Sequence, residues 1–178
     1  MKHPDHVNLL RPANVPGTGP WADLGSGDGA FTLALRDLLG SNTEIISVEK
    51  DKARLERQRR NFLAQFPESN MRYLNADFMR PMRLPPLEGV VMANVLHFFR
   101  DKESVLLHLR GMLKEKGRLV IVEYNVDSGN PWVPFPVSFK SCAPLVMRAG
   151  FIEVQLIGTA PSSFLGQFYS ALAFKGSL

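Results

Sequence analysis

Apolar positions along the chain alternate between short strand-like runs and stretches with helical spacing. Strand-like runs cover residues 21–24, 44–48, 71–74, 90–93 and 118–124. Helical spacing follows several of these runs, over 30–39, 50–66 and 103–113. This β-α-β repetition predicts a parallel sheet covered by helices, with its ligand at the carboxyl ends of the strands.

The last third of the sequence predicts a short helix and two further strands. The runs 152–157 and 168–174 are separated by a loop too short for a crossover helix, so they should pair antiparallel. Before them, a helix ends near residue 149, and Pro144 favours Ser141 over Ser138 as its N-cap, since proline belongs in a first turn. The prediction is an α/β fold with a Rossmann-like, mostly parallel seven-stranded sheet, helices on both faces and an antiparallel final strand.

The beginning of the chain has a different composition. Residues 1–20 contain four prolines and two glycines, which predicts an irregular N-terminal arm. The remaining residues, 21–178, fit one domain of ordinary size. The domain organisation expected is therefore an arm followed by a single folded unit.

Composition places the chain among globular proteins. Hydrophobic residues make up 45% and charged residues 21% of its 178 residues. No apolar run reaches the roughly 20 residues of a membrane span, and residues 1–6 lack the apolar core of a secretory signal, so a cytoplasmic protein without a membrane partner is expected. Cys142 is the single cysteine, and no Cys/His cluster predicts a metal.

Positive charge is concentrated in one predicted helix. Six of the residues from Lys50 to Arg60 are cations and two are acids, a local +4 that equals the net charge of the chain. Apolar residues at 55, 62, 63 and 66 share one face, which places the cations on the solvated side. A solvated surface is favoured over a phosphate-binding one, and nucleic acid is not expected as a partner.

A glycine-rich turn, residues 23–29 (DLGSGDG), joins the first strand to the first predicted sheet helix. Its glycines allow positive φ and close approach of a ligand to free helix N–H groups. The G-x-G-x-G spacing differs from the G-x-G-x-x-G of dinucleotide enzymes. Asp23 and Asp28 would repel a pyrophosphate but attract an ammonium and a sulfonium, which favours S-adenosylmethionine as the ligand.

From Trp21 to Lys175 the sequence resembles the class I S-adenosylmethionine-dependent methyltransferases. The resemblance lies in five motifs that follow predicted strands in the family's order: residues 23–29, Glu49, 75–78 (NADF), 93–98 (ANVLHF) and 113–123 (LKEKGRLVIVE). The small-molecule branch with the ubiquinone and menaquinone biosynthesis methyltransferases looks nearest.

The resemblance implies roles at the cofactor. Asp23 would face the methionyl ammonium, Glu49 would accept hydrogen bonds from the ribose hydroxyls, and Asp77 would accept one from the adenine amino group. The alternatives are a helix-capping role for Asp23 and a surface salt bridge for Glu49. The turn backbone would contact the methionyl part, Phe78 and Leu24 would surround the ring unless Phe78 is ordinary core, and the full cofactor set is Asp23, Leu24, Gly25, Ser26, Gly27, Gly29, Glu49, Lys50, Asp77, Phe78 and Asn94.

The acceptor side is less defined. His97 is the imidazole of this constellation, hence the candidate general base or substrate contact, with a hydrogen-bonded packing role as the alternative. Glu123 and Tyr124 end strand five and could orient an acceptor. Methyl transfer by direct displacement can also proceed by alignment alone.

The pocket for the methyl acceptor would be bounded by residues 1–20 and 125–140. Trp132, Phe135 and Phe139 are candidate lid residues in the second segment. Because both segments are short, either the pocket is open and serves a large partner, or a second subunit closes it in a homodimer.

We expect methyl transfer to a small-molecule acceptor. A base-directed nucleic-acid methyltransferase would carry Pro-Pro-aromatic at strand four, or a cysteine nucleophile there, and neither is present. Asp23 and Asp28 argue against an NAD-dependent oxidoreductase, because they would repel its pyrophosphate. An RNA or protein methyltransferase, and a non-catalytic cofactor- or partner-binding protein of the same fold, stay open as alternatives.

Overall fold

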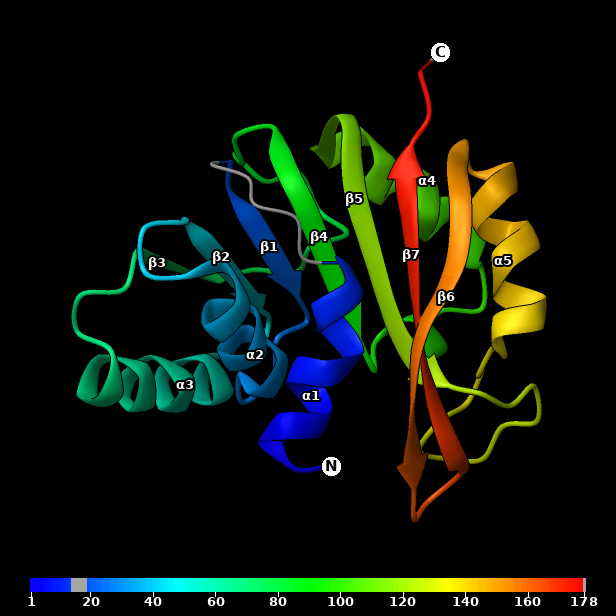
Figure 1. Ribbon diagram of the computed structural model, residues 1–178, viewed down its shortest axis with the longest axis horizontal. Helices are drawn as coiled ribbons and strands as arrows, with labels where there is room; N and C mark the ends of the chain where they lie inside the picture. Colours follow the sequence, from blue (N-terminus) through cyan, green and yellow to red (C-terminus); the bar gives the residue numbers. More distant parts are fainter. Residues whose placement is uncertain (14–18, 178) are drawn as a thin grey trace.

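The computed structural model describes residues 1–13 and 19–177, and its centre is a seven-stranded sheet in the order β3-β2-β1-β4-β5-β7-β6 (Figure 1). The strands are β1 (Trp21–Leu24), β2 (Ile45–Glu49), β3 (Met71–Asn75), β4 (Leu87–Ala93), β5 (Leu113–Tyr124), β6 (Phe151–Ser162) and β7 (Gly166–Lys175). The first five are parallel, and β7 runs antiparallel between β5 and β6. The predicted α/β class and antiparallel final strand are confirmed.

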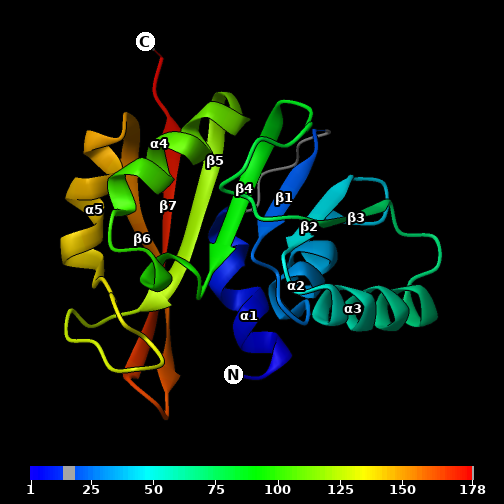
Figure 2. The same cartoon turned by 180° about the vertical axis from the view of Figure 1, so that it is seen from behind.

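Helices cover both faces of the sheet, as Figures 1 and 2 show from opposite sides. One face carries α1 (His3–Leu10) and α2 (Ala30–Leu39), and the other carries α4 (Lys102–Met112) and α5 (Phe139–Arg148). The helix α3 (Lys52–Gln65) lies beside β2 and β3. Because both faces are covered, every residue of β1 and β2 is buried, which explains why both strands are mainly apolar. Their polar residues, Asp23, Ser47 and Glu49, are buried as well.

The N-terminal segment, expected to be irregular, begins with a helix. Pro4 lies in the first turn of α1, where its missing N–H costs no hydrogen bond. Val7, Leu9 and Leu10 are buried against α2 and the sheet. Burial of this apolar face outweighs the breaker composition of the arm, whose residues 14–18 lie outside the described residues.

The N-cap of α5 is Ser138, and the expectation of Ser141 is wrong. Asp127 accepts hydrogen bonds from the Ser138 backbone N–H (2.8 Å) and from the hydroxyls of both serines (2.8 and 3.1 Å). This carboxylate fixes the start of the helix one turn earlier than Pro144 suggested, so the proline lies inside α5. Within the described ranges, no helix is long and apolar enough to cross a membrane.

Candidate functional site

The glycine turn between β1 and α2 is held from two sides. The backbone N–H groups of Gly25 and Ser26 donate to the Val48 carbonyl at 2.8 and 3.1 Å. Gly25 has φ +75°, and a Cβ there would lie 2.6 Å from the Val95 side chain. Gly29 has φ +89°, and its Cβ would meet the Gln58 side chain at 2.6 Å. Only glycine fits these two positions, because both the conformation and the space exclude a side chain.

A buried hydrogen-bond network lies behind the turn and joins β1, β2, α2 and α3. Thr32 Oγ1 donates to Asp23 Oδ2 at 2.5 Å, and Gln58 Nε2 donates to Thr32 Oγ1 at 2.8 Å. Gln58 Oε1 accepts from Ser47 (2.9 Å) and Ser26 (3.2 Å). Gln58 was missed at the sequence level, although it is the polar residue between Leu55 and Phe62 on the apolar face of the basic helix.

Asp23 is the charged member of this network. Its side chain is buried, and the loss of hydration raises the pKa of the carboxyl from 3.8 to about 7. The Thr32 hydrogen bond opposes this rise, and the nearby Glu49 carboxylate adds to it. Asp23 therefore lies behind the glycine turn, in an environment where added positive charge would favour its ionised form.

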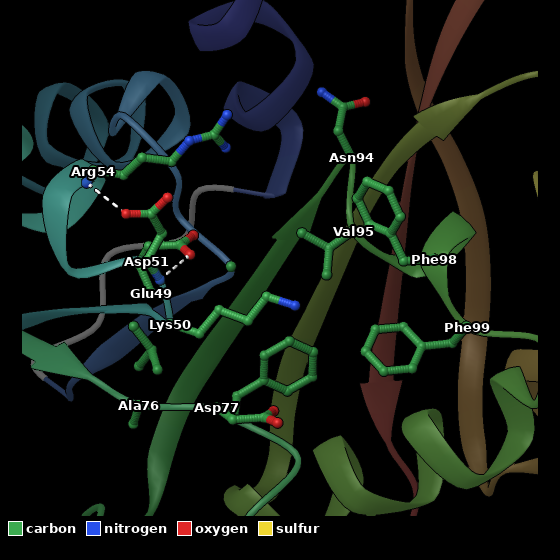
Figure 3. A pocket seen from close by; sticks show the side chains of 13 residues that line it. Glu49, Lys50, Asp51, Arg54, Ala76, Asp77, Asn94, Val95, Phe98 and Phe99 are labelled. Carbon is green, nitrogen blue, oxygen red and sulfur yellow. Dashed lines mark hydrogen bonds between the residues drawn. The ribbon is translucent and has the colours of Figure 1, made fainter. Parts of the chain in front are cut away.

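A cavity of about 320 Å³ opens at the carboxyl ends of the parallel strands, in front of the turn (Figure 3). It is lined by Gly25, Val48, Glu49, Lys50, Asp51, Arg54, Ala76, Asp77, Phe78, Asn94, Val95, Phe98 and Phe99. Six residues of the expected cofactor set belong to this lining: Gly25, Glu49, Lys50, Asp77, Phe78 and Asn94. Leu24, Ser26, Gly27 and Gly29 belong to the strand end and turn behind it.

Backbone donors fix the carboxylates of Glu49 and Asp77, two of the three that line the cavity. Glu49 Oε2 accepts from the Gly27 N–H at 2.9 Å, and Oε1 accepts from the Asp51 N–H at 2.8 Å. Asp77 Oδ1 accepts from the Met79 N–H at 3.0 Å. Each carboxylate keeps acceptor capacity for a ligand, since an ionised carboxyl offers about four lone-pair sites.

The cavity floor and rim add apolar and cationic groups. Phe78 and Phe99 make an edge contact with centroids 5.8 Å apart. Asn94 has φ +57°, and its buried Oδ1 has no hydrogen-bond partner among the described residues. Lys50, which belongs to the expected cofactor set, and Arg54, which does not, add positive charge to the lining (Figure 3).

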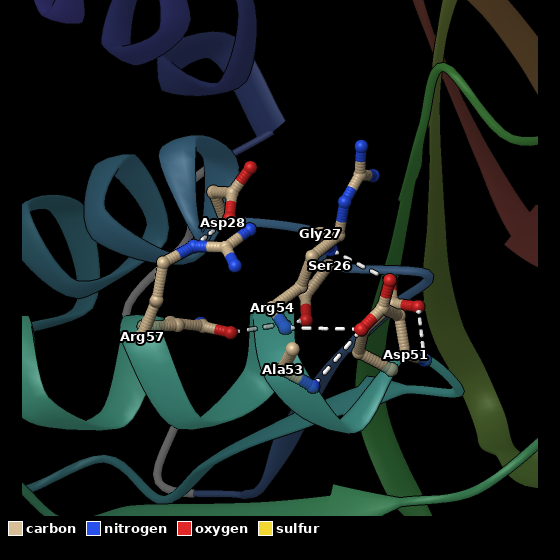
Figure 4. Close-up of polar contacts among 9 residues, drawn as sticks. Ser26, Gly27, Asp28, Asp51, Ala53, Arg54 and Arg57 are labelled. Carbon is tan, nitrogen blue, oxygen red and sulfur yellow. Dashed lines mark hydrogen bonds and ion pairs between the residues drawn. The ribbon is translucent and has the colours of Figure 1, made fainter.

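Asp28, the second acid of the turn, is outside the cavity lining. It accepts from Arg57 Nη2 at 2.7 Å on the exposed side of α3 (Figure 4). The acids at the cavity are instead Glu49, Asp51 and Asp77, with Asp23 behind the turn. From its position in the turn, Asp28 was expected to attract the positively charged ligand. The sequence does not show that its side chain points towards α3.

A second polar group lies beyond the cavity, where β4 and β5 end. His97, in the short 3-10 helix η2 (Leu96–Phe98), is buried, and its Nδ1 lies 2.7 Å from Glu123 Oε2. The other carboxylate oxygen accepts from the His97 backbone N–H at 3.2 Å. A carboxylate only accepts, so Nδ1 carries the proton and Nε2 presents its lone pair. The histidine and glutamate predicted separately thus form one pair.

Tyr124 is in ring contact with His97, at 6.1 Å between centroids. Of the three candidate lid residues, only Trp132 is exposed. Phe135 is covered by Arg100, and Phe139 packs edge-on against the buried Tyr169. Phe135 and Phe139 are half-buried and each ring contacts another part of the fold, and a lid role for them stays a prediction.

Comparison with known proteins identifies the family. A family model described as "Methyltransferase domain" matches residues 22–119, more than half of the chain. The chain belongs to this methyltransferase family. S-adenosylmethionine is its cofactor, as the resemblance implied. A search of curated proteins gives no match.

Solved structures show the same fold. The methyltransferase is similar to YcgJ from Bacillus subtilis, with 13% identity over 97% of this chain and 99% of that one, at a TM-score of 0.78. It is similar to an S-adenosylmethionine-dependent methyltransferase from Aquifex aeolicus, with 16% identity over 96% and 89% and a TM-score of 0.73. Human N-acetylserotonin methyltransferase, solved with S-adenosylmethionine, is 20% identical over 98% of this chain and 52% of the human one, at 0.72.

The cavity of the methyltransferase fits this cofactor. Gly25 leaves room where any Cβ would collide, and two carboxylates stand ready to accept hydrogen bonds from hydroxyl or amino groups. Phe78 supplies apolar surface beside them. When bound, the cofactor supplies a methyl group on positively charged sulfur, which suits a site with buried acids.

Proposed function

We propose that the methyltransferase methylates a hydroxyl of a small-molecule acceptor and that His97 removes the hydroxyl proton. The observation that carries this proposal is the buried His97–Glu123 pair, with its 2.7 Å contact next to Phe98 of the cofactor cavity. A buried carboxylate on Nδ1 holds the imidazole in the tautomer whose Nε2 accepts a proton.

His97 and Glu123 divide the work. With the cofactor bound, the acceptor oxygen would bond to the methyl carbon as the carbon–sulfur bond breaks and neutral S-adenosylhomocysteine leaves. The hydroxyl proton would pass to Nε2 of His97, so the methylated product is uncharged. Glu123 has no exposed surface and uses both oxygens on His97, so it acts as a positioning residue that stabilises the imidazolium. A positioned base of this kind contributes about 10²- to 10⁴-fold to a rate.

The cofactor residues position the methyl donor relative to His97. Glu49 and Asp77 accept from the ribose and adenine groups, Phe78 contacts the ring, and Asn94 brings its backbone to the methionyl part. The lining of the cavity by these four residues supports the assignment. Asp23 adds negative charge behind the turn for the ammonium.

The test uses methyl-labelled S-adenosylmethionine with a cell extract separated into a small-molecule fraction and a macromolecular fraction. We expect label in the small-molecule fraction, attached to oxygen, with at least 100-fold less product from His97→Ala. His3→Ala, which changes an exposed imidazole paired with Asp37, is the matched control and should retain full activity. Label that enters protein or RNA, or a rate that His97→Ala leaves intact, contradicts the proposal.

A further inference from the structure

A chain of aromatic rings leads away from the cofactor cavity. Phe98 lines the cavity, and its centroid lies 4.2 Å from that of His97. Tyr124 follows at 6.1 Å from His97, and Phe164 at 6.0 Å from Tyr124. Trp132 ends the chain with an edge contact to Phe164 at 6.3 Å. The platform, defined as Phe98, Tyr124, Trp132 and Phe164, thus joins η2, β5, the loop before α5 and the β6–β7 turn.

Three rings of the platform are exposed although their backbones are well held. The exposed fractions are 72% for Trp132, 58% for Phe98 and 50% for Phe164. Asn130 Oδ1 accepts from the Trp132 N–H at 2.9 Å, and Ser162 Oγ accepts from the Phe164 N–H at 3.2 Å. Large apolar rings presented to water by hydrogen-bonded turns mark a binding surface, because their exposure is unfavourable until a ligand covers them.

The two segments that carry Trp132 and Phe164 are uncharged. Residues 128–139 and 154–174 contain no acidic or basic side chain, in a chain with 21% charged residues. The polar pair closest to the turn, Asn125 and Gln167, is internally bonded at 2.9 Å. Burial raises the pKa of the Tyr124 hydroxyl, which keeps it neutral. These segments offer no counter-charge to a phosphate, a carboxylate or an ammonium group.

We propose that the platform is the acceptor-binding surface and that it selects an uncharged, planar acceptor, an aromatic ring carrying the hydroxyl to be methylated. The inference rests on the proposed function, because the His97–Glu123 pair lies inside the ring chain, between Phe98 and Tyr124. Planar rings stack on aromatic faces and edges, and the absent charges disfavour ionic acceptors.

The two tryptophans of the chain provide a direct readout of binding. Trp21 is 1% exposed and Trp132 is 72% exposed, so quenching of emission by acrylamide reports Trp132. With S-adenosylhomocysteine present, 4-propylphenol should shield Trp132 saturably. 4-Hydroxybenzoate and tyramine, which carry a charge on the same ring, should bind at least about 10-fold more weakly.

Variants locate the binding. Phe164→Ala and Trp132→Ala should each weaken calorimetric binding of 4-propylphenol by about 3- to 10-fold, in proportion to the lost ring contact. Leu156→Ala is the matched control, since Leu156 is 48% exposed on β6 but takes no part in the ring chain. Affinity for S-adenosylhomocysteine should stay within 2-fold in all three variants.

Three results would overturn the inference. One is the absence of saturable phenol binding in a protein that binds S-adenosylhomocysteine, or equal binding of the charged and uncharged phenols. Another is a blue shift of Trp132 with neutral phosphatidylcholine vesicles without phenol binding, which would make the platform a membrane surface. The third is a dimer in sedimentation that Trp132→Ala dissociates. Failure of the proposed function is distinct, because phenol binding is measured without turnover and does not require His97 to act as a base.

Discussion

The two halves of the sheet offer a ligand opposite chemistry. Around β1–β3, carboxylates, amides and hydroxyls form a connected network, with the cations of α3 beside it. Around the ends of β5–β7, uncharged aromatic segments surround a single buried His–Glu pair. The comparison suggests that the donor is recognised through charge and hydrogen bonds and the acceptor through apolar contact.

The sharpest test of this division is His97→Ala. Turnover should fall about 10²- to 10⁴-fold, because the acceptor hydroxyl loses its base, while affinity for S-adenosylhomocysteine stays unchanged. Steady-state kinetics with the identified acceptor and calorimetry with S-adenosylhomocysteine measure the two quantities. Glu123→Gln should also lower turnover, since glutamine has one acceptor oxygen and its NH2 group would face either the backbone N–H or the Nδ1–H of His97. Loss of cofactor affinity in His97→Ala would show that the two halves are not separate.

Asp23 gives the donor half a pH dependence. Its folded-state pKa of about 7 exceeds the ordinary 3.8, so the folded state binds the extra proton. Stability from this group is fully present below pH 3.8 and is lost as pH rises through 7, by at most about 4 kcal/mol. Denaturant unfolding from pH 4 to 8 should show this decline in the wild type, and Asp23→Asn should lack it.

Binding of the positively charged cofactor should oppose the raised pKa of Asp23. Positive charge bound in front of the turn lowers the Asp23 pKa, so binding of S-adenosylmethionine at pH 6 should release up to one proton from this group. Calorimetry in two buffers of different ionisation enthalpy counts the protons. Thr32→Val is a second variant for this measurement, because it removes the hydrogen bond that lowers the pKa of Asp23. Equal proton release in wild type and Asp23→Asn would assign the charge recognition to another group.

Glu49→Ala should weaken S-adenosylhomocysteine binding by about 1 to 3 kcal/mol, the usual cost of losing a buried hydrogen-bond partner. The change also frees the N–H groups of Gly27 and Asp51. Glu49→Gln, which keeps one acceptor oxygen, should fall between wild type and alanine. Binding of 4-propylphenol to the platform should not change. An equal loss of phenol affinity would contradict the separation of the cofactor site from the acceptor site.

The smallest effect is expected at the exposed face of α3. The double variant Arg59→Ala and Arg60→Ala should change stability by no more than about 0.5 kcal/mol, because exposed charges contribute little. RNA binding, measured as a function of salt, should be weak and equal in both proteins. Arg57 is left in place because it pairs with Asp28 of the glycine turn. Salt-sensitive RNA affinity that the double variant abolishes would contradict a purely solvated face.

The donor half could be read from the sequence because its signals are local. A strand, three alternating glycines and a helix follow one another within residues 21–39, and only one backbone path suits them. Glu49 ends β2 and Asp77 lies two residues after β3, so the parallel sheet brings them to the same edge. The direction of the Asp28 side chain was missed, since its partner Arg57 lies 29 residues away.

The acceptor half depends on contacts between distant segments. Phe164 meets Trp132 and Tyr124 only because β7 inserts beside β5, and no local pattern contains that information. Likewise, α1 depends on burial against α2, and the start of α5 depends on Asp127. Tertiary contacts override local propensity in each case.

The insertion of β7 also bears on how the chain is made. Residues 166–175 leave the ribosome after the other six strands of this sheet, yet they fill an interior position and bond to β5 and β6 on both sides. Until then, the strand from Leu119 to Val122 is an apolar edge with unpaired backbone groups, the kind of edge that recruits other chains. Synthesis therefore leaves the nascent chain dependent on protection from aggregation until β7 emerges.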